Sequence, residues 1–255
     1  MAELFIPFRL TPGAIGVNLR QLRGVDELSL DDIRTKSLLN LLQSLITPVS
    51  NEKTVNNLNA EQIVTADRDR ILAALYISLY GSKVESTISC ESCKQLFDLD
   101  FSLNDLVSHY ESASTHNLED GSFELEPGVR FRFPTGEDEM MINGFSQGEA
   151  EKVLLQRCLL EGDPETEKEK VELKMAEMAP VLNIEMEAHC PECNYTQQVR
   201  FDLQSFFLMK LKQERPRLIN EIHRIASHYH WSQQVILDLP RSLRKQFVTL
   251  IESEM

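Results

Sequence analysis

Two pairs of cysteines are the residues of this chain whose type and spacing could do chemistry. Each pair has the form Cys-x-x-Cys, and the second pair, Cys190 and Cys193, lies one hundred residues after the first, Cys90 and Cys93. Four thiolates supplied by two tight turns match the tetrahedral sulfur coordination of a structural zinc ion. The sequence therefore predicts one structural zinc held by these four cysteines.

The separation of the two pairs leaves alternatives open. The pairs of a compact zinc ribbon are about 15 to 20 residues apart, whereas 96 residues separate Cys93 from Cys190. The cysteines could therefore be a metal-free remnant of a ribbon, or two pairs that never meet. Disulfides are disfavoured because no signal peptide is recognised, which favours a reducing compartment. Redox chemistry is disfavoured because two similar hairpins suit a chelate better than one active dithiol at a helix N-terminus.

The sequence around each cysteine pair repeats as well, and this repeat indicates the fold. Polar, alternating residues precede both pairs, at 85–89 and 185–189, and a phenylalanine follows eight residues after each pair, as Phe101 and Phe201. Alternation on both sides of a tight turn is typical of a β-hairpin. The expected fold class is α+β: two zinc-knuckle β-hairpins that form a split zinc ribbon, and a mainly helical remainder with a C-terminal helical bundle.

Apolar residues at helical spacing and capping residues predict the remaining elements. The expected helices cover 29–45 with Ser29 as the cap, 66–80, 103–110, 147–160, 164–179, 203–229, 233–239 and 241–253, and another hairpin covers 123–133. The segment 1–24 is expected to be irregular because Pro7 and Pro12 interrupt regular structure. Three domains are expected: an N-terminal arm and helix (1–63), a core of duplicated zinc-knuckle hairpins (64–203) and a C-terminal helical region (204–255).

The terminal helices are expected to pack onto the long helix 203–229. The side chains predicted to form this contact are Trp231, Ile236, Leu239, Phe247 and Leu250. The basic residues Arg241, Arg244 and Lys245 fall on the other side of the last helix and are expected to be exposed.

The remaining residues of chemical interest give no catalytic site. Cys158 lies in an apolar helical run and is expected to be a buried small side chain. His189 adjoins Cys190 and is an alternative zinc ligand, whereas the three histidines between 223 and 230 do not share one helical face, and His230 is expected to cap a helix end. No nucleotide-binding or hydrolase motif occurs, and no carboxylates are paired for acid–base work. The chain is therefore expected to be no enzyme and to bind no small-molecule substrate.

Charge and hydropathy restrict the classes of partner. The formal net charge is −14, which argues against binding to nucleic acid, because such binding neutralises phosphates. No apolar stretch approaches the length that a membrane-spanning helix needs, so no segment is expected to span a membrane. The expected partners are therefore other proteins.

An apolar arm at the N-terminus is the predicted partner-binding segment. Its apolar side chains are Leu4, Phe5, Ile6, Phe8 and Leu10. This apolar density is unusual at a chain terminus and predicts docking onto another protein. Docking of the arm onto the chain's own domain is the alternative.

The C-terminal segment 222–251 resembles a known signature. It reads IHRIASHYHWSQQVILDLPRSLRKQFVTLI and is similar to the C-terminal segment of baseplate hub proteins and hub-assembly chaperones of contractile-tailed phages and phage-like injection particles. The segments 133–138 and 155–158 and the two cysteine hairpins look similar to such proteins too. The resemblance covers about residues 65–255, and the segment 1–60 carries none.

This resemblance implies a structural or assembly role in the baseplate of a contractile injection system, near its hub. The implied partners are other baseplate or tail proteins, and the resemblance brings no enzymatic chemistry with it. The implied location is the host or bacterial cytoplasm during assembly, and then the virion tail or injection particle. A zinc-ribbon adaptor of the transcription or RNA machinery is the alternative function.

Overall fold

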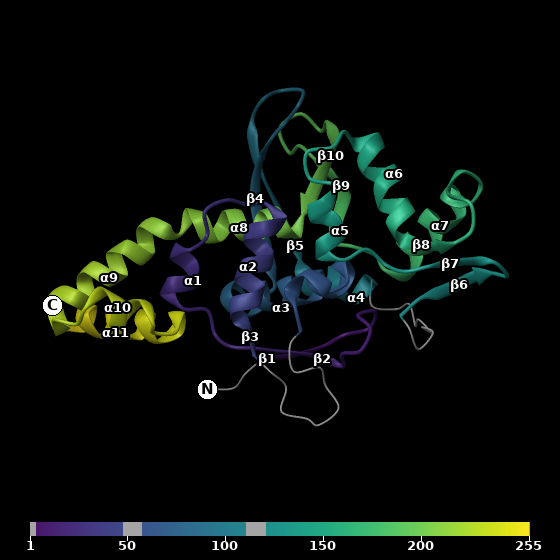
Figure 1. The fold of residues 1–255 in the computed structure, drawn as a ribbon. Helices are drawn as coiled ribbons and strands as arrows, with labels where there is room; N and C mark the ends of the chain where they lie inside the picture. Colours follow the sequence, from purple (N-terminus) through teal and green to yellow (C-terminus); the bar gives the residue numbers. More distant parts are fainter. Residues whose placement is uncertain (1–3, 48–57, 111–120, 255) are drawn as a thin grey trace. The chain divides into compact units, whose positions relative to one another are not determined.

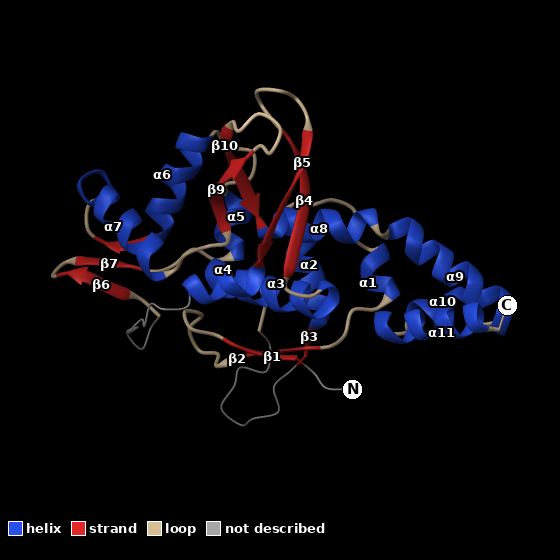
Figure 2. Ribbon diagram, turned by 180° about the vertical axis from the view of Figure 1, so that it is seen from behind, coloured by secondary structure: helices blue, strands red, loops and turns tan. Residues whose placement is uncertain are grey.

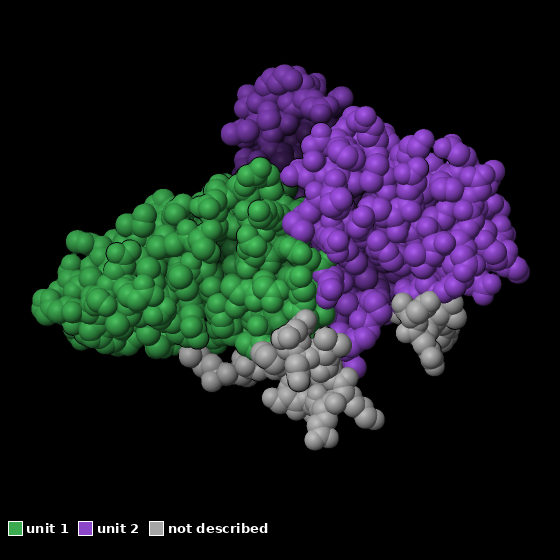
Figure 3. All heavy atoms as spheres, in the orientation of Figure 1, with its two compact units in different colours: residues 1–7, 16–61, 204–255 green, residues 8–15, 62–203 purple. Residues whose placement is uncertain are grey.

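In the computed structural model the chain divides into two compact units, which Figure 3 shows in different colours. The structure describes residues 4–47, 58–110 and 121–254. Unit 1 comprises Met1–Pro7, Gly16–Glu61 and Gln204–Met255, and unit 2 comprises Phe8–Ile15 and Gln62–Leu203. The N-terminal and C-terminal segments thus share one unit, whereas the division into three domains stays a prediction.

Unit 1 combines a small antiparallel sheet with helices from both ends of the chain (Figure 1). Its strands pair in the order β1-β2-β3 and are β1 (Leu4–Pro7), β2 (Gly16–Leu19) and β3 (Ile46–Thr47). Its helices are α1 (Gly24–Leu28), α2 (Thr35–Leu45), α8 (Leu203–Gln213, whose first residue belongs to unit 2), α9 (Arg215–Tyr229), α10 (Gln233–Leu237) and α11 (Arg241–Ser253), and a 3-10 turn, η1 (Ala60–Gln62), ends at the unit boundary. The leucines of α2 at 38, 39, 41, 42 and 45 are buried.

The expectation that the segment 1–24 is irregular is wrong. β1 pairs with β2 in the register Leu4↔Leu19 to Pro7↔Gly16. Proline removes one backbone donor, and a sheet tolerates that loss at an edge strand or a strand end. Pro7 stands at both, because β1 is the outer strand and Pro7 is its last residue.

Ser29 does not begin a helix, which corrects a second expectation. The helix expected over 29–45 is α2, which ends at Leu45 as expected but begins at Thr35, six residues after Ser29. A separate short helix, α1, precedes it, and its Asp26 carboxylate accepts a hydrogen bond from the N–H of Arg23 at 2.9 Å. Ser29 lies at the C-terminal end of α1. Its side chain fits either helix end, so local sequence could not decide between them.

The C-terminal helices largely follow the sequence expectation, and α10 and α11 pack on α9 (Figure 2). The long segment 203–229 is two helices with Glu214 between them, because Pro216 enters the first turn of α9. The Ser232 hydroxyl caps α10 by accepting a hydrogen bond from the N–H of Val235. Ile236 is buried and Trp231 and Phe247 are partly buried against it, but Leu250 is half exposed, which contradicts its predicted place in the core.

Unit 2 contains two long hairpins, a second three-stranded sheet and several helices. The hairpins are β4 (Lys83–Ser89) with β5 (Leu96–Ser102) and β9 (Asn183–His189) with β10 (Thr196–Asp202), and the sheet joins β6 (Phe123–Glu126), β7 (Val129–Phe131) and β8 (Leu159–Glu161). The helices are α3 (Thr65–Tyr80), α4 (Leu103–Tyr110), α5 (Gly136–Met141), α6 (Gln147–Cys158) and α7 (Pro164–Met178). Helix α5 and strand β8 were not expected from the sequence, and β8 takes the last two residues of the helix predicted over 147–160.

The duplicated hairpins confirm the repeat read from the sequence. A helix follows each hairpin, and the N–H of its first residue donates to the carbonyl of the residue just before the hairpin. The N–H of Leu103 donates to the Ser82 carbonyl at 2.8 Å, and that of Leu203 to the Leu182 carbonyl at 3.0 Å. The rings of Phe101 and Phe201 pack edge to face with centroids 4.9 Å apart. The two repeats therefore contact each other through equivalent residues.

Within the described parts of the chain, no helix combines the length and the apolar character needed to cross a membrane.

Candidate metal centre

The two knuckles at the hairpin tips have the same backbone. In the first, the N–H of Cys90 bonds the Gln95 carbonyl at 2.9 Å and the N–H of Lys94 returns to the Cys90 carbonyl at 3.0 Å. The second repeats both bonds one hundred residues later, at 2.9 Å each. Lys94 and Asn194 both have a left-handed backbone, with φ of 63° and 57°. The equivalent conformations turn the two cysteines of each pair toward one point.

The four cysteine sulfur atoms come together, so the two pairs do meet. All four lie within 4.8 Å of one another. The Sγ atoms of Cys90 and Cys193 are 3.7 Å apart, as are those of Cys93 and Cys190. A tetrahedron with metal–sulfur bonds of about 2.3 Å has edges of about 3.8 Å. The spacing of the sulfur atoms therefore fits a tetrahedral metal ion, with one ligand pair from each hairpin.

The electrostatics of the cluster also fit a cation. Burial raises the pKa of the Cys90 thiol, but hydrogen bonds from the N–H groups of Cys93 and Ser92 outweigh burial and lower that pKa to about 6. The N–H of Gln95 lowers the pKa of Cys93, but burial and the other three sulfur atoms raise it to about 12. Adjacent thiolates repel each other, so the four cysteines cannot all be thiolates without a cation between them. A divalent cation removes this conflict because it holds each cysteine as the thiolate.

The other candidate ligands lie outside this cluster. The ring of the exposed His189 contacts the Thr196 hydroxyl at 2.8 Å and the Glu187 carboxylate at 3.4 Å. Cys158 is buried as expected, and burial raises the pKa of its thiol to about 12. His230 forms the C-terminal cap of α9 with a φ of 56°, as predicted. The cysteine cluster is thus the candidate metal site among the described residues.

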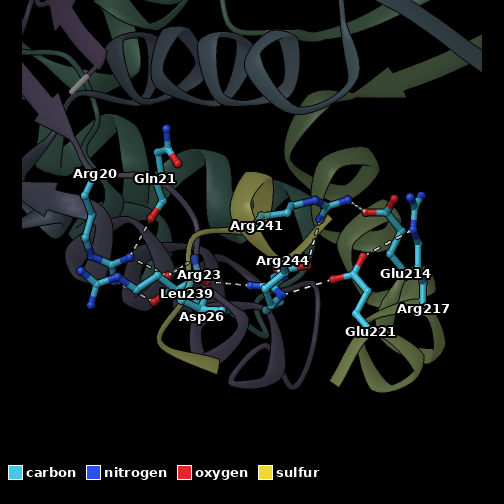
Figure 4. Close-up of polar contacts among 11 residues, drawn as sticks. Arg20, Gln21, Arg23, Asp26, Glu214, Arg217, Glu221, Leu239, Arg241 and Arg244 are labelled. Carbon is cyan, nitrogen blue, oxygen red and sulfur yellow. Dashed lines mark hydrogen bonds and ion pairs between the residues drawn. The ribbon is translucent and has the colours of Figure 1, made fainter. Parts of the chain in front are cut away.

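A buried ion network in unit 1 was missed by the sequence reasoning. Arg241 and Arg244, which were expected to be exposed, are buried, and Figure 4 shows them pointing toward acidic side chains. Arg244 donates to Glu27 of α1, to Glu221 of α9 at 3.2 Å and to the Leu239 carbonyl at 2.9 Å. The network also includes a 2.9 Å bond from Arg241 to Glu27 and an ion pair from Arg241 to Glu214. Lys245 is partly buried.

A second network unites the two internal segments that carried the family resemblance. Asp138 is fully buried and accepts hydrogen bonds from Arg132 at 2.6 and 2.9 Å and from Arg157 at 2.6 Å. The N–H and hydroxyl of Thr135 add two more, at 3.0 and 3.1 Å. Burial raises the pKa of Asp138, but these bonds outweigh burial and hold that pKa well below its usual range. The segments 133–138 and 155–158 are therefore held together by the hydrogen bonds of Asp138.

The N-terminal arm is only partly exposed. Asp67 of α3 accepts hydrogen bonds from the N–H groups of Arg9, Leu10 and Thr11 at 2.9, 3.0 and 2.7 Å and from the Thr11 hydroxyl at 2.8 Å. This contact lies within unit 2, and Asp67 is buried. Of the predicted partner-binding residues, Ile6 and Leu10 are buried, Phe8 is partly buried, and Leu4 and Phe5 are exposed. Ile6 and Leu10 thus pack inside the protein, and the role of the arm in partner binding stays a prediction.

Comparison with known proteins supplies the family. No curated protein and no solved structure matches the chain. A family described as T4 bacteriophage base plate protein matches residues 13–161. The match includes the first cysteine pair, Asp138 and Arg157, and it begins far before residue 65, which corrects the expected extent of the resemblance. Because the match spans more than half of the chain, the protein belongs to the T4 bacteriophage base plate protein family.

Proposed function

We propose that this protein is a structural or assembly component of the hub region of a contractile tail baseplate and acts by binding other tail proteins. The observation that carries the proposal is the family match over residues 13–161. That match favours this function over a zinc-ribbon adaptor of the transcription or RNA machinery. The net charge of −14 supports protein partners over nucleic acid.

The four clustered cysteines are proposed to hold one structural zinc. Cys90, Cys93, Cys190 and Cys193 offer only thiolate ligands, and a closed sulfur set of this kind suits a structural rather than a catalytic ion. The ion would join two hairpins whose cysteine pairs are separated by 96 residues of chain. Its role is therefore to fix the two repeats against each other, and no enzymatic step is assigned to it.

The exposed end of the arm is the proposed contact with a neighbouring subunit. Leu4 and Phe5 are 38% and 46% exposed on the outer strand of the small sheet of unit 1. An outer strand leaves backbone groups available for pairing with another strand. The proposed contact therefore combines strand pairing with two apolar side chains.

Co-purification with baseplate subunits tests both parts of this function. The tagged full chain, expressed with the tail genes of its own particle, is expected to recover baseplate proteins. The double change Leu4→Ser and Phe5→Ser should reduce that recovery several-fold. The matched control changes Ile219 and Leu250, which are 56% and 52% exposed elsewhere in unit 1. Recovery that is lost equally in both variants would contradict the arm contact, and no recovery by the unaltered chain would contradict the function.

A permanent component and an assembly chaperone differ in one observable. Mass spectrometry of purified particles should find peptides of this chain at a fixed ratio to the tail-tube protein if it stays in the baseplate. Peptides found with assembly intermediates alone would identify a chaperone. Absence from particles and from intermediates would contradict a baseplate role.

A further inference from the structure

Gln197 connects the two hairpins beside the cysteine cluster. It lies on β10 of the second hairpin and is buried although it is polar. Its side-chain oxygen accepts a hydrogen bond from the N–H of Glu91 at 2.8 Å, and its side-chain nitrogen donates to the Ser89 carbonyl at 3.2 Å. These two partners are the backbone groups on either side of Cys90. One side chain of the second hairpin therefore holds the first knuckle at its first cysteine.

The two hairpins differ where this contact requires a difference. One hundred residues after Glu91 stands Pro191, which has no N–H to satisfy. One hundred residues before Gln197 stands Phe97, which is buried and apolar. The first knuckle offers the N–H of Glu91, and the second hairpin places Gln197 beside it. The second knuckle has Pro191 and offers no N–H there, and the first hairpin carries Phe97 at the position equivalent to Gln197. Buried polar groups need hydrogen-bond partners, so this pairing of residue types follows from the backbone of each knuckle.

We propose that Gln197 is a positioning residue of the metal site, which sets metal affinity by fixing Cys90 against the hairpin that carries Cys190 and Cys193. This inference rests on the proposed binding of zinc by the four cysteines. Cys90 and Cys193 belong to different hairpins, and their sulfur atoms must stay about 3.8 Å apart to share one ion. Groups that orient metal ligands without touching the metal typically change metal affinity by about 10- to 100-fold.

Metal affinity and ligand geometry test this role in the full chain. Gln197→Leu removes both hydrogen bonds at similar volume and is expected to weaken zinc binding by about tenfold or more, measured by competition with a chromophoric chelator. Bound Co²⁺ should also show shifted visible bands, because the sulfur atoms are no longer held in the same geometry. The control is Gln198→Leu, which changes the exposed neighbouring residue and should match the unaltered chain. Gln197→Asn, one methylene shorter, should lose affinity in the same direction if the leucine variant does not fold.

A rescue experiment separates positioning from general packing. The double variant Glu91→Pro with Gln197→Phe rebuilds at the first knuckle the residue pair found at the second, and it is expected to bind zinc more tightly than Gln197→Leu. Unchanged zinc affinity and an unchanged Co²⁺ spectrum in Gln197→Leu or in Gln197→Asn would overturn the role of Gln197. An unaltered chain that binds neither metal would overturn the proposed zinc site itself, and this inference with it.

Discussion

Arg244 is a charged side chain that forms part of the core of unit 1. It is fully buried between Glu27 and Glu221, and burial raises the pKa of Glu27 although Arg241 and Arg244 oppose the shift. A buried ion pair adds little stability by itself, but removing one partner leaves an uncompensated charge. The network is thus part of the buried interior of unit 1 rather than a surface feature.

Arg244→Met should lower the free energy of unfolding by about 3 to 5 kcal/mol because it leaves Glu27 and Glu221 buried without this partner. Urea unfolding followed by the fluorescence of Trp231 measures the loss, because Trp231 is the sole tryptophan and packs in unit 1. The control Arg34→Met removes an exposed pair with Asp32 and should leave stability nearly unchanged. Equal effects of the two variants would contradict the buried network.

Asp69 gives the protein a pH dependence of its own. Burial raises the pKa of this carboxyl to about 6, although Arg68 and the N–H of Leu182 oppose the shift. The folded state thus binds the proton more tightly than the unfolded state, whose pKa is about 3.9. The contribution of Asp69 to stability therefore falls as the pH rises from about 4 to about 6, by roughly 3 kcal/mol in total.

Asp69→Asn should remove this dependence and keep an oxygen for the Leu182 N–H, which now lies 2.7 Å from the carboxylate. The unfolding free energy of the variant, minus that of the unaltered protein, should increase between pH 4 and pH 6 and then level off. Urea titrations at several pH values measure the unfolding free energies of the variant and of the unaltered protein. A difference that stays flat or decreases over this range would show that the pKa of Asp69 is not raised.

For single residues, the predictions from sequence succeeded where the evidence was local and failed where the contacting residues are far apart along the chain. The four cysteines were found because each pair is local and the two pairs repeat. Arg244 was expected on the exposed side of its helix, but it is buried, and its partner Glu27 is 217 positions away. Hydrophobic periodicity shows which residues share a helix face but not which other elements cover that face. It therefore could not predict that Arg244 is buried.

At the scale of elements, strong local signals set the outcome. Helix α11 begins at Arg241 and ends at Ser253, as expected, because Pro240 and the apolar spacing mark it, and both knuckle hairpins follow from alternation around a turn. The short strand β8 had no such signal, because its pairing depends on β7, which lies far earlier in the chain. Pro7 led to a wrong prediction of irregular structure, because its position on an outer strand depends on tertiary structure that the local sequence does not show.

Two truncations test how the N-terminal arm is attached. Deleting residues 1–5 removes the exposed Leu4 and Phe5 and should leave thermal stability nearly unchanged. Deleting residues 1–12 also removes Leu10 and Thr11, and it should lower the free energy of unfolding by about 4 kcal/mol or more, because a core leucine is lost and Asp67 keeps a buried carboxylate without these donors. Equal stability of the two truncated chains would contradict the anchoring contact.

At the scale of the whole molecule, family membership and the cysteine cluster describe different parts of the chain. The family match ends at residue 161, so it includes Cys90 and Cys93 but neither Cys190 nor Cys193. The second hairpin completes the sulfur set from outside the matched region. The metal centre must therefore be tested on this chain itself, because family membership does not supply it.

Metal removal should destabilise the protein. A link between the two cysteine pairs closes a loop of 96 residues, and in the chain-entropy view a cross-link of this span contributes about 4 to 5 kcal/mol. Incubation with a strong chelator should therefore lower the midpoint of thermal unfolding, and added zinc should restore it. A protein shown by metal analysis to have lost its zinc, yet with an unchanged midpoint, would refute a structural role for the ion.

X-ray absorption at the zinc edge, recorded on the purified full chain, tests the assignment of the four cysteines as zinc ligands, because it reports both the presence of the ion and its ligands. We expect one zinc per chain with four sulfur neighbours at about 2.3 Å. Replacing the exposed Cys193 by serine should reduce the sulfur number to three. A chain without zinc, or a zinc coordinated mainly by nitrogen and oxygen, would contradict the assignment of Cys90, Cys93, Cys190 and Cys193 as its ligands.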